Sequence, residues 1–396
     1  MTKKKKVILL CYEMLEFGGI NRLVSGYQTG FKKLGYEVVT YLSSRNGRLQ
    51  VNEGSYTLQT KWFRPPSRNL GWANKQQMDE YKRQVKESEF VLMIHGAPHP
   101  TKSSAKGDFE WQQLYEIPKK RKKPVAILFT DNPWNRSYRW IEEVIDRKTT
   151  LLYCNWNAKF DSMEKLTYEA QFIDYPIDMD EQAAKTHNKP RKVDVAWLTQ
   201  WKKWKGIHEF VSQLSDNPSA FYTVLFNSGI EYYNMRLEPY WSKAIREERR
   251  PRTGPARNTP DYYDPIIHNS SSTTDYFGLV YPHQVSRIYA NSKLCLDLSG
   301  AFSKKFEAQF TCAMAEPMVH HSLVAVPPYI YDDEKSRIQG VPITWSVDPN
   351  AIIDSLEEIL AQPRRRQILT QNAYDWVRDN CSDDRVAQRT ADLILA

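Results

Sequence analysis

The chain is poor in cysteine, and its cysteines are widely separated. There are five in 396 residues, and no two of them form a C-x-x-C pair. This spacing argues against a disulfide framework or a cysteine-rich zinc site. Cys11, Cys154 and Cys295 lie in apolar, strand-like runs, so we expect them to be buried and reduced. A reducing compartment follows.

Long apolar runs are also absent. The basic run Lys3–Lys6 is followed by an apolar stretch that ends by Tyr12-Glu13. That stretch is too short for the hydrophobic region of a signal peptide. No segment approaches the roughly 18–20 apolar residues of a membrane span. We therefore expect a cytoplasmic protein.

Histidines at metal-ligand spacing are missing too. His95 and His99 flank Gly96-Ala97-Pro98 after an apolar run, but no third ligand stands near them, and His320-His321 is far away in the sequence. We therefore expect no structural metal.

Positive charge and aromatic side chains are abundant. Fifty-five Lys and Arg against 47 Asp and Glu give a net charge of +8, and there are 12 Trp and 23 Tyr. Basic and aromatic residues together are typical of surfaces that bind nucleic acid, and also of sugar and nucleotide sites. Charge alone fits a basic soluble enzyme without a polyanionic partner equally well.

The order of apolar runs predicts an α/β fold with two domains, since 396 residues are too many for one ordinary core. In the first half, short apolar runs alternate with helical patterns such as 22–34, which Gly35 ends. This alternation predicts βαβ units and a parallel sheet. The predicted strands of this half are 7–12, 37–42, 90–95, 125–130, 151–154 and 170–174.

The polar stretch 181–192 is predicted to be a linker, after which the alternation resumes. Pro363 separates two C-terminal helical segments, and Ser382-Asp383-Asp384 is predicted to cap the last of them. The predicted elements of this half are strands 193–198, 223–226, 293–298 and 323–326, and helices near 206–214 and 304–315.

One segment breaks the alternation. Residues 245–275 hold five arginines and several prolines, and they end in a run of Asn, Ser and Thr. A poorly patterned stretch of this length is either a functional loop or disordered.

Two turns of the same kind follow apolar strands in the two halves. Gly18-Gly19 follows the strand 7–12, and Trp201–Gly206 follows the strand 193–198. Glycine lets a backbone approach a ligand closely, and a helix start favours a phosphate. Lysines at a helix start oppose the helix dipole, so Lys202, Lys203 and Lys205 indicate a function. The alternatives are an ordinary glycine turn and a solvated lysine cluster.

Two carboxylates complete the candidate site. Asp131 directly follows the strand 125–130, where it can accept the proton of an attacking hydroxyl. Glu316 lies at the end of the helical pattern 304–315 and can accept hydrogen bonds from both hydroxyls of a ribose. An ordinary turn sequence and a surface glutamate are the alternatives.

Together these features resemble the nucleotide-sugar glycosyltransferases of the GT-B fold. More narrowly, the chain resembles the phage DNA-modifying glycosyltransferases, typified by the T-even bacteriophage DNA α-glucosyltransferase, in a patchy match that runs nearly end to end. The match includes Trp197 followed seven residues on by Trp204-Lys205-Gly206. It also includes Leu298-Ser299 before Glu316, and Asp131 at the end of its strand.

The resemblance implies an α/β fold of the GT-B type, with two Rossmann-like parallel-sheet domains facing each other across a cleft. Residues 1–185 would form the acceptor (DNA) domain and 193–375 the nucleotide-sugar donor domain. Residues 376–396 would form a C-terminal helix that packs back on the first domain.

The implied reaction moves a sugar from a UDP-sugar to the hydroxymethyl group of 5-hydroxymethylcytosine in double-stranded DNA. It would protect phage DNA from host nucleases. The donor would be UDP-glucose, the family default, or a UDP-pentose such as UDP-arabinose. The resemblance further implies retention of the anomeric configuration, no required metal, no membrane, and a monomer in the host cytoplasm.

Each residue of the site has an implied role. Asp131 is the catalytic carboxylate, and Trp134 is a candidate to stack on the flipped base or fill its gap. The implied donor-binding residues are Gly18, Gly19, Gln200, Lys202, Lys203, Lys205, Tyr281, Ser299 and Glu316. The implied DNA-binding residues are Arg64, Arg68, Trp134, Arg136, Arg139, Arg249, Arg250 and Arg252, with Lys119–Lys123 as further phosphate contacts.

The chain departs from the family pattern at two places. Gln200 stands where an arginine usually binds the donor phosphates, which leaves Lys202 or Lys203 to replace it. Glu307 and Glu316 are separated by eight residues instead of seven, so only Glu316 is carried over. The alternatives are a glycosyltransferase of bacterial surface glycan or lipid-linked sugar, and a degenerate GT-B scaffold that binds nucleic acid.

Overall fold

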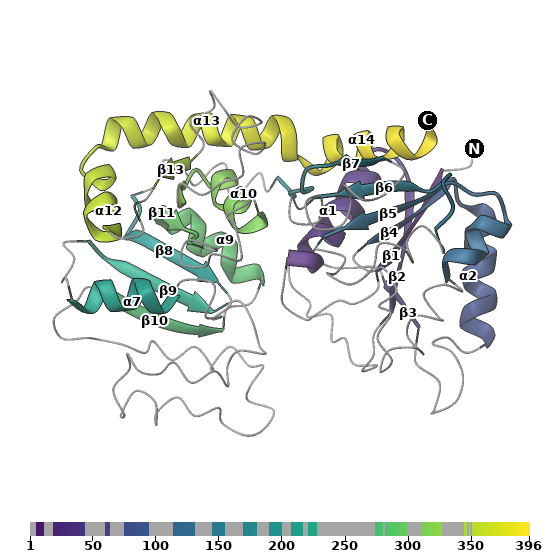
Figure 1. Cartoon of the computed structure of the whole chain (residues 1–396), viewed down its shortest axis with the longest axis horizontal. Coiled ribbons are helices and arrows are strands. Elements are labelled where there is room, and N and C mark those ends of the chain that lie inside the picture. Colours follow the sequence, from purple (N-terminus) through teal and green to yellow (C-terminus); the bar gives the residue numbers. More distant parts are fainter. Residues whose placement is uncertain are drawn as a thin grey trace, which may run out of the picture. The chain divides into compact units, whose positions relative to one another are not determined.

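The structure, a computed structural model, divides into two compact α/β units (Figure 1). Unit 1 comprises Met1–Asp178 and Asn380–Ala396, and unit 2 comprises Met179–Asp379. The residues that the structure describes are 5–11, 19–43, 60–63, 75–94, 114–130, 145–154, 169–179, 190–199, 207–216, 221–227, 274–279, 282–298, 311–326, 344–346, 348 and 351–396.

Unit 1 is built on a seven-stranded sheet with the order β3-β2-β1-β4-β5-β6-β7, in which every neighbouring pair is parallel. Its central strands are continuous buried runs, as parallel strands covered on both faces must be. The strands are β1 (Lys6–Cys11), β2 (Glu37–Ser43), β3 (Thr60–Phe63), β4 (Phe90–Ile94), β5 (Val125–Phe129), β6 (Thr150–Tyr153) and β7 (Ala170–Phe172).

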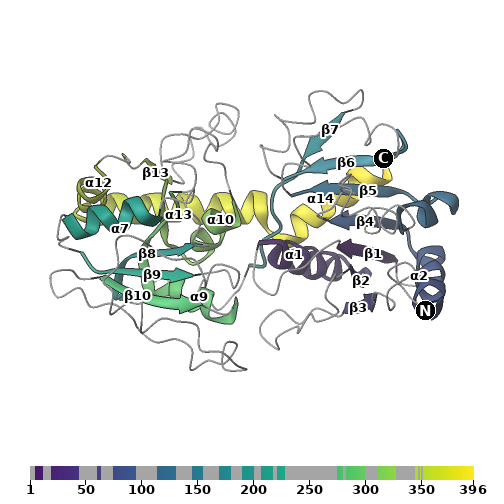
Figure 2. The same ribbon diagram turned by 60° about the horizontal axis from the view of Figure 1, so that its bottom comes forward.

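Helices from opposite ends of the chain cover one face of this sheet. Helix α1 (Gly19–Lys33) and helix α14 (Asp383–Leu395) lie side by side in both ribbon views (Figure 2) and share one core cluster with alternate residues of β1. Helix α2 (Lys75–Glu87) lies on the other face, where its Tyr81 packs edge-on against Tyr41 of β2. Because side chains alternate along a strand, both faces of the sheet are buried.

Unit 2 is built on a six-stranded parallel sheet with the order β10-β9-β8-β11-β12-β13. The indole of Trp197, in β8, packs edge-on against Phe210 on one face, and Tyr289 belongs to the core of the other face. The strands are β8 (Val193–Thr199), β9 (Thr223–Asn227), β10 (Thr274–Leu279), β11 (Ser292–Leu296), β12 (Leu323–Val326) and β13 (Thr344–Ser346). The helices are α7 (Ile207–Asp216), α9 (Pro282–Asn291), α10 (Cys312–Val319), α12 (Ile352–Leu360) and α13 (Pro363–Cys381).

The predicted α/β class and parallel sheets are confirmed, and the predicted strands are found with their ends shifted by one or two residues. The sequence analysis missed three strands, β3, β10 and β13, and each of them forms an edge of its sheet. An edge strand is only half enclosed, so it needs no continuous apolar run. The predicted basic insertion 245–275 was wrong at its end, because Thr274 and Asp275 belong to β10; its other residues lie outside the described part.

The two predicted helix boundaries had different outcomes. Gly35 ends α1 as predicted: it adopts a left-handed conformation with φ +85°, and the amide of Tyr36 bonds to the carbonyl of Phe31 at 2.9 Å. Ser382 occupies the N-cap position of α14 as predicted, but its side chain makes no capping hydrogen bond. Asp383 instead accepts a bond from the amide of Asp384 at 3.0 Å.

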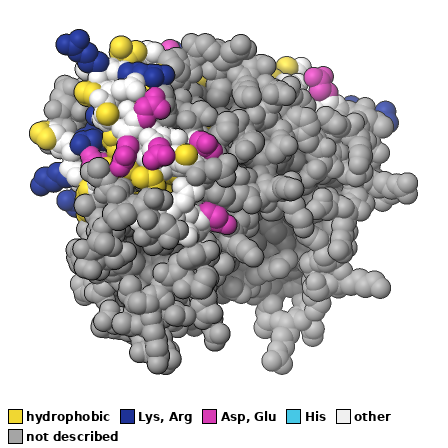
Figure 3. Space-filling view, turned by 60° about the vertical axis from the view of Figure 1, so that its left-hand side comes forward, with side chains coloured by type: hydrophobic (Ala, Val, Ile, Leu, Met, Phe, Trp, Pro, Cys, Tyr) yellow, Lys and Arg dark blue, Asp and Glu magenta, His cyan; other side chains and the backbone are white. Residues whose placement is uncertain are grey.

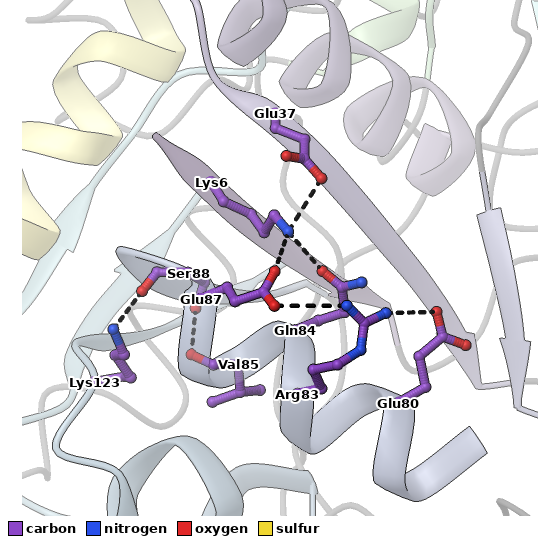
Figure 4. A network of polar contacts seen from close by, with 9 residues as sticks. All are labelled: Lys6, Glu37, Glu80, Arg83, Gln84, Val85, Glu87, Ser88 and Lys123. Carbon is purple, nitrogen blue, oxygen red and sulfur yellow. Dashed lines mark hydrogen bonds and ion pairs between the residues drawn. The ribbon is translucent and has the colours of Figure 1, made fainter. Parts of the chain in front are cut away.

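Lys6 ties together the amino-terminal edge of the unit 1 sheet (Figure 4). Its ammonium lies 2.7 Å from Glu87, 2.9 Å from the side-chain oxygen of Gln84 and 3.1 Å from Glu37. Glu87 and Gln84 belong to the end of α2, and Glu37 starts β2. The last lysine of the amino-terminal basic run is therefore a buried structural residue.

Arg191 links neighbouring elements at the amino-terminal edge of the unit 2 sheet, as Lys6 does in unit 1. Its guanidinium donates to the carbonyls of Tyr289, Ser292 and His320 at 3.1, 2.5 and 2.6 Å, and to the hydroxyl of Ser322 at 2.7 Å. Tyr289 and Ser292 lie shortly before and at the start of β11, and His320 and Ser322 lie just before β12. The prediction of a linker through residue 192 was therefore wrong at its end, whereas residues 180–189 lie outside the described part.

All five cysteines are buried and free, as we expected for Cys11, Cys154 and Cys295. Among the described helices none is both long and apolar enough to cross a membrane.

Candidate functional site

The strand order of unit 1 reverses between β1 and β4. Numbering falls from β3 to β1 and then rises from β4, so the connections leave these two strands toward opposite sides. In an open parallel sheet, ligands bind at the carboxyl ends of the strands next to such a reversal. Cys11 and Ile94 pair at that end, and α1 begins at Gly19 shortly after β1. The predicted glycine turn therefore stands at the position where this fold binds ligands.

Unit 2 has the same reversal between β8 and β11. The stretch 200–206 connects β8 to α7, whose first residue is Ile207. A helix of this length has unpaired amides at its start and a positive dipole end. The predicted lysine turn thus connects the strand beside the reversal to a helix start. A helix start is a position that favours a bound anion.

Buried polar side chains lie at the carboxyl ends of β8 and β11 and on the helix α10 between β11 and β12. Thr199 ends β8, Asp297 directly follows β11 and Glu316 lies on α10, and all three are at least nine-tenths buried. The hydroxyl of Thr311, the residue before α10, lies 3.4 Å from a carboxylate oxygen of Asp297. Buried polar groups of this kind can hold a polar ligand.

We predicted that Glu316 lies at the end of its helix, and this prediction was wrong. Helix α10 runs from Cys312 to Val319, so Glu316 lies in its second turn and Pro317 follows within the helix. The expected helix 304–315 was therefore wrong at its carboxyl end, and its residues 304–310 lie outside the described part. Burial of Glu316 rules out the alternative of an ordinary surface glutamate.

Most of the other predicted site residues lie outside the described residues, so the structure does not test whether they come together. Gly19 is the first residue of α1. Predicted site residues outside the described part are Gly18, Asp131, Gln200, Lys202, Lys203, Lys205, Tyr281 and Ser299, and the DNA candidates Arg64, Arg68, Trp134, Arg136, Arg139, Arg249, Arg250 and Arg252.

Asp297 is a candidate that the sequence analysis missed. It is a carboxylate directly after the buried run of β11, which is the same signal that singled out Asp131 after β5. The rule did not find Asp297 because the predicted strand 293–298 included it, whereas β11 ends at Leu296. Its 3% exposure and its position beside the strand reversal place it among the polar groups of the candidate site.

The described residues form no group of metal ligands, and one face of the molecule shows mixed charge. No group of three or more His, Cys, Asp or Glu side chains within it could hold a metal ion. On the face shown in Figure 3, the basic and acidic side chains of the described residues lie next to one another. Those side chains alone do not make a basic patch there.

Comparison with known proteins gives a match of fold. No family model matches the chain, and no curated protein matches it in sequence. An α-glucosyltransferase solved with UDP-glucose and DNA containing an abasic site has a TM-score of 0.66 at 11% identity, with both chains fully covered. The same kind of enzyme with UDP and a mismatched 13-mer DNA has a TM-score of 0.67 at 13% identity, covering 99% and 100% of the two chains.

A third similar structure is the Anabaena protein Alr3699/HepE in complex with UDP. Its TM-score is 0.63 at 10% identity, and 98% of each chain is covered. The fold of the whole chain is therefore the GT-B fold that the sequence predicted, with one Rossmann-like parallel sheet in each unit.

Proposed function

We propose that the chain is a UDP-sugar-dependent glycosyltransferase that modifies 5-hydroxymethylcytosine in duplex DNA. One observation carries the proposal: each unit has a strand reversal beside its first strand, and the candidate residues follow the strands around it. Unit 2 would bind the donor and unit 1 the acceptor. Glucose or a pentose such as arabinose would be the transferred sugar.

The proposed donor site uses the polar edge of unit 2. Glu316, buried on α10, would accept hydrogen bonds from the two ribose hydroxyls. The diphosphate would lie at the start of α7, where Lys205 and the helix amides meet it. Gln200 stands where the family usually has an arginine for the donor phosphates, and Lys202 or Lys203 would take over that role. Gly18, Gly19, Tyr281 and Ser299 would complete the contacts.

In the proposed reaction the hydroxymethyl oxygen forms a bond to the anomeric carbon of the sugar. The bond between that carbon and the diphosphate oxygen breaks, and its electrons leave with UDP. Asp131, which follows β5, takes the hydroxyl proton. Lys205 and the amides of α7 stabilise the negative charge on the departing diphosphate. No step needs a metal ion.

The proposed acceptor explains the excess of positive charge. A chain with a net charge of +8 would gain most of its DNA affinity from phosphate contacts, which makes binding salt-dependent. The base must be flipped out to reach a cleft, at a cost of a few kcal/mol. Trp134 would stack on it or fill its gap. The phosphate contacts would come from Arg64, Arg68, Arg136, Arg139, Arg249, Arg250 and Arg252.

The direct test is mass spectrometry of nucleosides digested from treated DNA. Hydroxymethylated and unmodified duplexes would be incubated with the protein and a panel of UDP-sugars. We expect a hexose- or pentose-sized mass gain on hydroxymethylated DNA alone. Asp131→Ala should abolish it, whereas Asp79→Ala, which removes an exposed carboxylate of α2, should leave the rate unchanged.

Two other outcomes would replace the proposal. UDP release with glycan or lipid acceptors, and no gain on any DNA, would favour a surface-glycan glycosyltransferase. DNA binding without consumption of any donor would favour a nucleic-acid-binding scaffold.

The donor half can be tested without an acceptor. Glu316→Gln should weaken UDP binding in calorimetry by about tenfold, as expected for one lost hydrogen bond to a charged group. Glu358→Gln on the exposed face of α12 is the matched control and should leave the affinity unchanged. Equal affinities of the two variants would remove Glu316 from the proposed site.

A further inference from the structure

The chain passes between the two units twice, and both crossings leave unit 1 from the same place. The first crossing follows Asp178, and the second precedes Asn380. Beside them Ile177 and Ser382 form a short parallel bridge. The amide of Ile177 donates to the carbonyl of Cys381 at 2.7 Å, and the amide of Asp383 donates to the carbonyl of Ile177 at 3.0 Å. Two segments some 200 residues apart in sequence are thus held together by their backbones.

Helix α1 packs against both segments through glycines one turn apart. A Cβ added at Gly26 would come closer than 3.0 Å to the backbone of Pro176, and one added at Gly30 would do the same at the backbone of Asp383. Backbone atoms cannot turn aside as a flexible side chain can. The two glycines therefore fix where α1 lies against the crossings.

An ion pair also links the end of α1 to the start of α14. The ammonium of Lys33, in the last turn of α1, lies 2.7 Å from the carboxylate of Asp383, which is fully buried at the start of α14. Asp178 lies 3.8 Å from the same ammonium. A buried carboxylate without a cation is costly, so Lys33 holds the start of α14 in place.

Further along α14, two more polar contacts hold the helix on unit 1. The hydroxyls of Tyr27 and Thr390 are 3.1 Å apart, and Arg389 donates to the buried Asp174 at 3.1 Å. We call the bridge 177/382, the two glycines and the Lys33–Asp383 pair the clasp.

We propose that the clasp is a positioning device, and that Lys33 and Asp383 are positioning residues for the transfer reaction. Helix α1 connects two places: its last turns carry the clasp, and its first residue, Gly19, stands at the strand reversal of unit 1. A helix is stiff, so fastening one end fixes the other. The clasp thereby holds both chain segments that lead to unit 2 against α1, the helix that begins at the proposed acceptor site. This inference rests on the proposed function.

The chain offers matched controls for the test. Lys32 is the neighbour of Lys33 in the same turn and is exposed, and Asp384 follows Asp383. We expect Lys33→Met to lower the transfer rate at saturating donor by about tenfold, since small misplacements of reacting groups cost at least that much. UDP affinity should stay within about twofold, because the donor would bind in unit 2. Lys32→Met should change neither quantity.

A rescue experiment distinguishes the positioning role of the Lys33–Asp383 pair from the effect of losing the lysine charge. In Lys33→Met the carboxylate of Asp383 remains buried without its cation. Asp383→Asn in that background removes the charge and keeps an oxygen for the amide of Asp384. The double variant should recover most of the transfer rate, whereas adding Asp384→Asn to Lys33→Met should recover none. Equal rates for Lys33→Met and Lys32→Met would overturn the positioning role.

Amide hydrogen exchange tests the clasp and needs no substrate. In the unaltered protein, the amides of Ile177 and Asp383 should exchange as slowly as those of the unit 1 core. Lys33→Met should speed both, and Lys32→Met neither. Should the protein transfer no sugar to any acceptor, the proposed function fails, and this comparison decides on the clasp alone. Fast exchange at both amides in the unaltered protein would overturn it.

Discussion

Lys6 in unit 1 and Arg191 in unit 2 have corresponding places in the fold. Lys6 starts β1, and Arg191 lies two residues before β8, so each stands at the amino end of a strand that borders the reversal in its sheet. Each gathers neighbouring elements at the amino-terminal edge. Their partners differ. Lys6 binds two carboxylates and an amide oxygen, whereas Arg191 binds three backbone carbonyls and a hydroxyl.

The difference in partners changes what each cation contributes. Burial lowers the pKa of Lys6, but Glu87 and Glu37 together raise it by more, so its pKa lies above the ordinary lysine value. Burial lowers the pKa of Arg191, which no carboxylate offsets, and the guanidinium still stays charged. Lys6 thus acts through ion pairs with carboxylates, whereas Arg191 acts through hydrogen bonds to neutral acceptors.

Both devices lie at the edge opposite to the candidate site. Parallel strands present their amino ends at one edge and their carboxyl ends at the other, and ligands bind at the carboxyl ends. Structural cations at the amino edge leave the carboxyl edge free for Glu316, Asp297 and the turns that follow β1 and β8. The comparison therefore separates basic residues that stabilise the fold from those proposed to bind phosphate.

The largest expected effect is the loss of Arg191. Arg191→Met removes the guanidinium that donates to three carbonyls and a hydroxyl, and each hydrogen bond to a charged group contributes about 1.5–3 kcal/mol. We expect the free energy of unfolding to fall by about 3 kcal/mol or more in urea titrations. Arg191→Lys should recover little, because one ammonium cannot reproduce the guanidinium fork. Lys192→Met, at the exposed neighbouring position, should change stability by less than about 0.5 kcal/mol.

These two cations also mark the limit of what the sequence predicts. Strands such as β1, β4 and β5 were predictable because a buried parallel strand must be apolar throughout. Lys6 was placed in a basic terminal run and Arg191 in a linker. Their partners are 31 to 131 residues away, so nothing nearby in the sequence signals their burial.

The candidate site was predictable to the extent that topology fixes it. Once the alternation of strands and helices is known, a residue that follows a strand lies at the carboxyl edge, which places Asp131 and the turn before α7. Glu316 lies on a helix, and its burial depends on how α10 packs, which the sequence does not encode locally. The clasp was not predictable, because Gly26 and Gly30 read as ordinary helix residues until Pro176 and Asp383 pack against them.

A smaller effect is expected at Lys6. Lys6→Met keeps the aliphatic stem and removes the ammonium, but the side chains of Glu37 and Glu87 are 52% and 30% exposed and can turn toward water. We expect a loss of about 1–2 kcal/mol, between the values for surface and buried pairs. Lys5→Met is the control, since its pair with Glu89 is exposed and should contribute little. A loss as large as that of Arg191→Met would remove the distinction between the two devices.

The smallest effect, and the sharpest comparison, is the dependence on pH. A group whose pKa is raised on folding contributes stability that is complete below its unfolded pKa, here 10.5. That contribution is lost as the pH rises through the higher folded pKa. The stability difference between the unaltered protein and Lys6→Met should therefore shrink as the pH rises above 10.5, as the ammonium and its carboxylate pairs are lost. The difference for Arg191→Met should stay constant over that range, because the guanidinium does not titrate there. If the stability differences of the two variants instead change with pH in the same way in urea titrations, the ion pairs of Lys6 contribute no more to stability than the packing of its side chain does.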